Sequence, residues 1–146
     1  MKIFVLDRVS WLPAPRERVF AYFAEPENLR TLSPPSVGLE ILSAPPVLAL
    51  GSRIEMRIRA GGVPLRWRSE ITRFEPPVLF VDDLRRGPYR LWRHQHLLDE
   101  RDGGTSVRDY VRWSPPLPAL TARWIAAELE RIFEYRAEAM RRAFSR

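Results

Sequence analysis

The chain of 146 residues contains no cysteine. That absence excludes a disulfide framework, a cysteine-based zinc ribbon and catalysis by a thiol. A chain of this length can bury a sizeable core as one domain, residues 1–146, without any cross-link. A cysteine-free domain also suits a reducing compartment, and we expect a cytoplasmic protein.

Long apolar runs are missing as well. No segment approaches the roughly 18 consecutive apolar residues of a membrane span. The first residues carry a charge at Asp7 within MKIFVLDRVSW, which is not typical of a signal peptide. We therefore expect no membrane as a partner.

Lysine is almost absent, because Lys2 is the only one and every other basic residue is arginine. The net charge of +6 could indicate a nucleic-acid-binding protein. The arginines, however, are spread along the chain and alternate with acids, and no basic run, zinc pattern or RNA-binding aromatic signature is present. We expect no nucleic acid as a partner.

What the chain does contain is a regular succession of short alternating segments. Alternation of apolar and polar residues predicts strands. Near the C-terminus the apolar residues recur about every 3.6 residues without Gly or Pro, which predicts a long helix. Strands are predicted over 2–11, 37–42, 52–60, 65–74, 78–84, 89–99 and 105–113, and helices over 13–23, 25–32 and 119–144. Hairpin-linked strands with segregated helices indicate an α+β fold, a curved antiparallel sheet with the long helix packed on it and room for a cavity between them.

Both histidines of the chain, His94 and His96, lie two residues apart between Trp92 and Leu98. In a strand these four side chains share one face. The pair could be a polar layer of the core, a polar anchor in a ligand cavity or, less favourably, two metal ligands. A metal would need a third ligand such as Glu70, Asp82, Asp83 or Asp109, and we expect neither a metal nor a cofactor.

Three charged residues fall on faces that are otherwise apolar. Asp109 shares its face with Val107 and Val111, and a buried carboxylate needs a partner to stay ionised. One of the two aspartates in FVDDL should point inward, and Asp82 is favoured because it shares the face of Phe80. Arg136 lies at the edge of the stripe of the last helix, where it either snorkels to solvent or points inward to a carboxylate or a ligand.

Large apolar side chains of the predicted strands could line a cavity or simply fill a core. They are Trp67, Trp92, Trp113, Phe80, Met56 and Tyr89. No nucleophile elbow or phosphate-binding glycine loop is present. The candidate catalytic residues are therefore His94, His96 and Asp109, of which a histidine beside a carboxylate could act as a general base.

Several stretches resemble the SRPBCC superfamily, which includes START lipid-transfer domains, polyketide cyclases and plant pathogenesis-related allergens, and within it the bacterial ligand-binding SRPBCC domain family. They are PRERVFAYFAEPENLRTLSPP, GVPLRWRSEI, FVDDLRRGPYRLWRHQHLLDE, GGTSVRDYVRW and IFEYRAEAM. The resemblance covers nearly the whole chain and implies a helix-grip fold, with seven strands around the C-terminal helix and two short helices after the first strand.

The function that this resemblance implies is the binding or transport of a small hydrophobic or amphipathic ligand. The expected ligand-binding residues are Trp67, Phe80, Asp82, Trp92, His94, His96, Asp109, Trp113 and Arg136. A cyclase or dehydratase that uses His94 or His96 as acid and base, and a protein-interaction module that forms a homodimer, are the alternatives.

Overall fold

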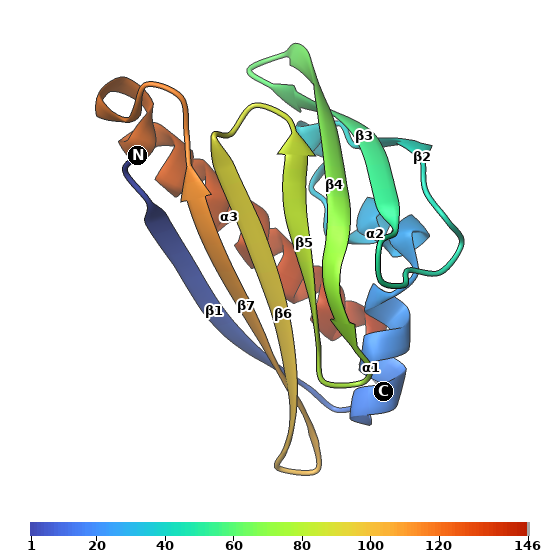
Figure 1. Ribbon diagram of the computed structural model, residues 1–146. Coiled ribbons are helices and arrows are strands. Elements are labelled where there is room, and N and C mark those ends of the chain that lie inside the picture. The colour runs from blue at the N-terminus through green and yellow to red at the C-terminus, as the bar shows by residue number, and fades with distance from the viewer. Residues whose placement is uncertain (146) are drawn as a thin grey trace.

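Seven strands form one antiparallel sheet in the computed structural model, which describes residues 1–145 (Figure 1). The strands follow the order β1-β7-β6-β5-β4-β3-β2, so that consecutive strands from β2 to β7 are neighbours. They are β1 (Phe4–Leu12), β2 (Glu40–Ser43), β3 (Arg53–Ala60), β4 (Val63–Glu75), β5 (Leu79–Arg86), β6 (Leu91–Arg101) and β7 (Gly104–Ser114). Hairpins join the strands one after another from β2 to β7, as the turn residues predict, and β7 lies beside β1.

The helices lie on one face of the sheet (Figure 1). The longest, α3 (Pro118–Ala143), begins with proline at its first position, where the missing N–H is tolerated. Its buried stripe includes Leu129, Phe133 and Met140, which pack on the sheet. The shorter helical segments follow β1 and are α1 (Arg16–Phe23), η1 (Pro26–Asn28), α2 (Leu29–Leu32) and η2 (Pro35–Val37). None of the helices in residues 1–145 is long and apolar enough to cross a membrane.

The pairing of β4 with β5 is irregular at two places. The pairing of β4 with β5 shifts between Arg68 and Ser69 and again between Ile71 and Arg73. Such bulges increase the local twist and redirect side chains. Both irregularities lie on the strand that contributes Trp67, Ser69 and Ile71 to the inner face.

The predicted elements are confirmed, and several of them begin or end a few residues from the predicted bounds. The segment from residue 37 begins with η2 rather than a strand, and β2 starts only after Gly38, whose φ of 57° ends the turn. The hairpin between β3 and β4 is tighter than predicted. Its two turn residues, Gly61 and Gly62, both have positive φ, which lets β4 start at Val63.

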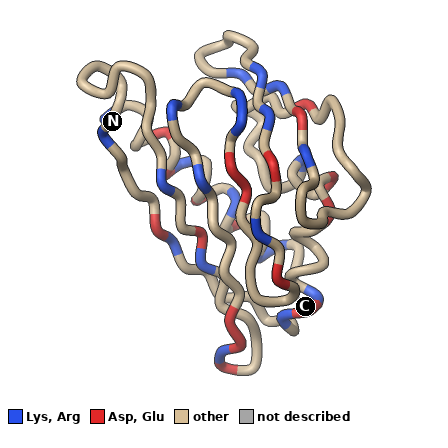
Figure 2. The backbone as a smooth tube through the Cα atoms, viewed as in Figure 1, with Lys and Arg blue, Asp and Glu red and all other residues tan. Residues whose placement is uncertain are grey.

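Basic and acidic residues alternate along the strands, as Figure 2 shows. On the outer face Arg108 of β7 makes two hydrogen bonds with Asp7 of β1, and Arg93 of β6 pairs with Asp83 of β5 at 2.7 Å. These ion pairs compensate much of the arginine content.

Candidate functional site

The two histidines form the middle of a stack of rings on the inner face of the sheet. His94 and His96 of β6 are both buried, as the alternation of this strand predicts, and their ring centroids are 3.7 Å apart. The ring of Phe80 from β5 stacks on the other side of His96 at 4.0 Å. Both imidazoles are thus held by packing in fixed orientations.

Two carboxylates flank this stack, one on each side. Asp109 Oδ1 of β7 is 2.7 Å from His94 Nε2, and Asp82 Oδ2 of β5 is 2.8 Å from His96 Nε2. The second nitrogens lie farther away: His94 Nδ1 is 3.8 Å from Asp82 Oδ2, and His96 Nδ1 is 3.7 Å from Asp109 Oδ1. An ionised carboxylate only accepts hydrogen bonds, so each Nε2–H donates to its aspartate.

Arg136 completes the polar cluster, as we call Asp82, His94, His96, Asp109 and Arg136. It reaches down from α3, is 7% exposed and places its NH2 group 3.7 Å from Asp109 Oδ1 and 3.5 Å from His96 Nδ1. Its guanidinium also lies over the ring of Phe23 at 5.2 Å. Arg136 therefore points inward and does not snorkel. Its Nε has no hydrogen-bond partner among residues 1–145.

Burial and neighbouring charges determine which groups of the cluster are ionised. Burial, followed by repulsion from His94, lowers the pKa of His96 to about 4, so this imidazole is neutral at pH 7. Burial opposes ionisation of Asp109, but the charge of Arg136 and the hydrogen bond from His94 outweigh it and hold the pKa of this carboxyl well below its usual range. Burial opposes ionisation of Asp82 too, but the hydrogen bond from His96 and the charges of the neighbouring groups together lower the pKa of this carboxyl. Two carboxylates thus face a single guanidinium.

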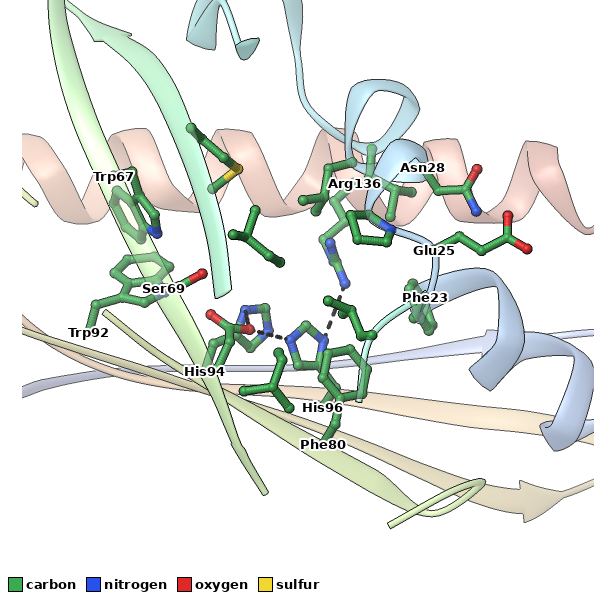
Figure 3. A pocket seen from close by; sticks show the side chains of 18 residues that line it. Phe23, Glu25, Asn28, Trp67, Ser69, Phe80, Trp92, His94, His96 and Arg136 are labelled. Carbon is green, nitrogen blue, oxygen red and sulfur yellow. Dashed lines mark hydrogen bonds and ion pairs between the residues drawn. The ribbon is translucent and has the colours of Figure 1, made fainter. Parts of the chain in front are cut away.

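An apolar cavity of about 150 Å³ lies directly against this cluster (Figure 3). Figure 3 shows His94, His96 and Phe80 on one side and Arg136 reaching toward them from the helix. The remaining walls come from β3, β4 and the segment around α2. The lining residues are Phe23, Glu25, Pro26, Asn28, Leu29, Leu32, Leu48, Ile54, Met56, Trp67, Ser69, Ile71, Phe80, Asp82, Trp92, His94, His96 and Arg136.

Two further cavities adjoin the first. The next, of about 180 Å³, shares walls with it at Trp67, Trp92 and His94. The outermost, of about 440 Å³, shares Tyr89 and other residues with the second. It lies between the β3–β4 hairpin and the first turns of α3, where Trp124 is 58% exposed. The three cavities thus extend from the polar cluster to the surface.

Most of the predicted site residues meet at this place. Those that line the first cavity are Trp67, Phe80, Asp82, Trp92, His94, His96 and Arg136. Asp109 lies behind the histidines and contacts them without lining any of the three cavities. Trp113 is buried on the same face but packs against Phe4, at 4.8 Å between ring centroids, and is not among the residues that line the cavities.

One side of the cavity, formed by the segment after α1, was not predicted from the sequence. Phe23, Glu25, Asn28, Leu29 and Leu32 close it over the sheet. This segment shows only short helical patterns, and nothing in its sequence indicates which strand it faces. Ser69 was missed as well, although the alternation of its strand places it between Trp67 and Ile71 on the inner face.

Comparisons with known proteins agree with this architecture. A family model described as polyketide cyclase/dehydrase and lipid transport matches residues 12–143. No curated protein sequence matches at a significant level.

Solved structures share the fold at low sequence identity. The Zhui aromatase/cyclase from Streptomyces sp. R1128 superposes with a TM-score of 0.77 at 14% identity, covering 95% of this chain and 92% of that one. Major latex-like protein 151 from Panax ginseng gives a TM-score of 0.72 at 8% identity, with 99% of both chains covered. A protein from Mycobacterium smegmatis gives 0.70 at 16% identity, covering 98% of this chain and 96% of the other. The helix-grip fold expected from the sequence is thereby confirmed, and the match over residues 12–143 shows that the chain belongs to the polyketide cyclase/dehydrase and lipid transport family.

Proposed function

We propose that the protein binds a small hydrophobic or amphipathic molecule between the sheet and α3, with the polar cluster as its anchor. The observation that carries this proposal is the direction in which the cluster faces. Asp82, His94, His96 and Arg136 line an apolar cavity, although buried charged groups are costly unless they are paired and hydrogen-bonded. A few convergent polar groups at the end of an apolar cavity are the usual composition of a ligand site. The family description, which includes lipid transport, supports the same function.

The free donors of Arg136 indicate what the ligand should carry. Its Nε has no partner among residues 1–145, and its NH2 group has only the two long contacts to Asp109 and His96. A buried donor that lacks an acceptor costs about 1–3 kcal/mol. A carbonyl, hydroxyl or carboxylate oxygen of the ligand would remove that cost, while its apolar part lies against Trp67 and Trp92.

The cavity volumes indicate the size of the ligand. Sites for small molecules usually measure about 300–1,000 Å³, which is more than the 150 Å³ of the inner cavity. A ligand of ordinary size must therefore extend past Trp92 into the adjoining cavity of about 180 Å³. We expect an elongated molecule with one polar end.

Native mass spectrometry of the purified protein, paired with a denaturing run, tests this proposal. A bound organic molecule that is lost on denaturation would support it, and a thermal-shift screen with fatty acids and polycyclic phenols would extend it to weak ligands. Ser69→Leu places a larger side chain in the cavity and should abolish binding. Ser106→Leu, the same change on the outer face of β7, should not. The proposal would be refuted if Ser69→Leu and Ser106→Leu bound the same ligand equally well, or if the wild-type protein bound no compound at all.

A second function, acid–base catalysis on a polyketide-like substrate, is favoured by one feature of the cluster. Each histidine is hydrogen-bonded to its own carboxylate, and a neutral His96 is in the correct state to accept a proton. If the protein is such an enzyme, His94→Ala or His96→Ala should lower kcat by at least about 100-fold and change a bell-shaped pH profile. Full activity of both variants on a compound that the protein turns over would exclude this role.

A further inference from the structure

The two sides of the histidine stack differ in how their carboxylates are compensated. On the side away from the cavity, Asp109 is 3.7 Å from the guanidinium of Arg136. On the cavity side, the only ion-pair partners of Asp82 within 4.0 Å among residues 1–145 are the two imidazoles. Asp82 thus lies near two imidazole nitrogens but has no arginine or lysine within ion-pair distance among these residues.

One donor atom from each of Asp82, His94 and His96 lies close to the other two. Asp82 Oδ2 is 2.8 Å from His96 Nε2 and 3.8 Å from His94 Nδ1, and one donor atom from each of the three residues lies within 4.8 Å of the others. Zinc binds nitrogen and oxygen at about 2.0–2.2 Å, which places neighbouring tetrahedral ligands roughly 3.4 Å apart. Because a metal–nitrogen bond lies in the plane of the imidazole, the two rings, which are stacked with an angle of 24° between their planes, must turn apart to bring all three donors onto one ion.

The strand pairing places the three residues next to one another. Asp82 and His94 are directly paired across β5 and β6, and His96 is the next residue on the same face. His94 Nε2–H donates to Asp109 at 2.7 Å, which leaves His94 Nδ1 free for a metal. A carboxylate that accepts the second N–H of a ligating histidine is the usual support of a metal site.

We propose that Asp82, His94 and His96 bind one divalent transition-metal ion of the zinc type, with Asp109 as the group that orients His94. Two imidazoles and one carboxylate suit Zn²⁺, Co²⁺ or Ni²⁺ rather than Mg²⁺ or Ca²⁺, which prefer oxygen ligands alone. Three protein ligands beside a cavity leave a coordination position open for water or for a donor atom of a ligand. Coordination through His96 Nε2 shifts the ring proton to Nδ1, which then no longer accepts from Arg136 and has Asp109 Oδ1 as an acceptor 3.7 Å away.

This site goes beyond the proposed binding of an organic molecule and can be tested without one. Protein stripped of metal by EDTA and of small molecules by an apolar resin is titrated with Co²⁺, whose visible absorption reports coordination, and then with Zn²⁺ by calorimetry. We expect one ion per chain, with a Co²⁺ spectrum typical of four or five ligands. A thermal-shift assay run in EDTA separately reports organic ligands, so the two proposals fail independently.

Neighbouring aspartates provide a matched pair of variants. Asp82→Asn should weaken binding of Zn²⁺ by at least about 100-fold, whereas Asp83→Asn should leave it unchanged, since Asp83 points outward to Arg93 and Thr72. Asp109→Asn should weaken binding about 10- to 100-fold while the stoichiometry stays at one. Zn²⁺ should also raise the Tm of the wild type and of Asp83→Asn but not of Asp82→Asn. The proposal is overturned if no ion binds at one per chain, or if Asp82→Asn binds as tightly as Asp83→Asn.

Discussion

Replacing Arg136 by methionine should destabilise the fold far more than the loss of a surface ion pair. Arg136 is 7% exposed, Asp109 is 3% exposed, and the two charged groups are 3.7 Å apart. With an effective dielectric constant of about 20, opposite charges at this distance attract by roughly 4–5 kcal/mol. Arg136→Met keeps an apolar contact with Phe23 but leaves Asp109 buried without its cation. We expect a loss of about 3–5 kcal/mol in the free energy of unfolding.

A double-mutant cycle separates the charge from the packing. Asp109→Asn removes the carboxylate charge, so the double variant Arg136→Met/Asp109→Asn should be more stable than the sum of the two single changes by about 2 kcal/mol or more. Urea unfolding followed by tryptophan fluorescence, in EDTA, gives the four free energies, and equal m-values are required for the comparison. Arg108→Met is the control: its ion pair with Asp7 is exposed, and its loss should cost less than about 1 kcal/mol.

Two results would refute this reasoning. If Arg136→Met costs no more than Arg108→Met, the charge of Asp109 is not held by the guanidinium. If the two single changes are additive within about 0.5 kcal/mol, the residues do not interact, whatever each contributes to stability.

Three further outcomes follow from the structure. Burial raises the pKa of Tyr89 above the ordinary tyrosine value of about 10. The stability that the neutral, buried phenol contributes is therefore complete below pH ~10 and is lost as the pH rises through the raised pKa. Absorbance titration at 295 nm should show a last component that Tyr89→Phe removes. Phe80→Ala, which empties a buried position beside His96, should cost about 3–5 kcal/mol in urea unfolding. Gly104→Ala should cost about 1–3 kcal/mol in urea unfolding, because its Cβ would collide with the carbonyl oxygen of Leu12.

Much of the site could be predicted from single strands because alternation determines which side chains share a face. His94 and His96 lie inward with Trp92, as predicted. The choice between Asp82 and Asp83 was also correct, since Asp82 shares the inner face of Phe80 and Asp83 pairs outward with Arg93. These predictions needed only two facts: strand side chains alternate between two faces, and the face with the large apolar residues points inward.

The contacts within the cluster depend on how β5, β6, β7 and α3 are placed against one another, which the sequence pattern of a single element does not indicate. Asp82 is directly paired with His94 across the strands, and Asp109 with His96, yet the short hydrogen bonds run diagonally, from Asp82 to His96 and from Asp109 to His94. Arg136 could not be assigned a direction, because a residue at the edge of a helical stripe can turn either way until the carboxylate beneath it is known.

The stack of Phe80, His96 and His94 has a consequence for spectroscopy. Each imidazole carbon-bound proton near the face of a neighbouring ring experiences its ring current, so the histidine signals in an NMR spectrum should be displaced from those of an unstructured chain. Because the chain has only two histidines, these signals need no long assignment procedure. The carbon-bound protons of two imidazoles beside the cavity would therefore report separately on an ion, a small molecule or a proton as each arrives.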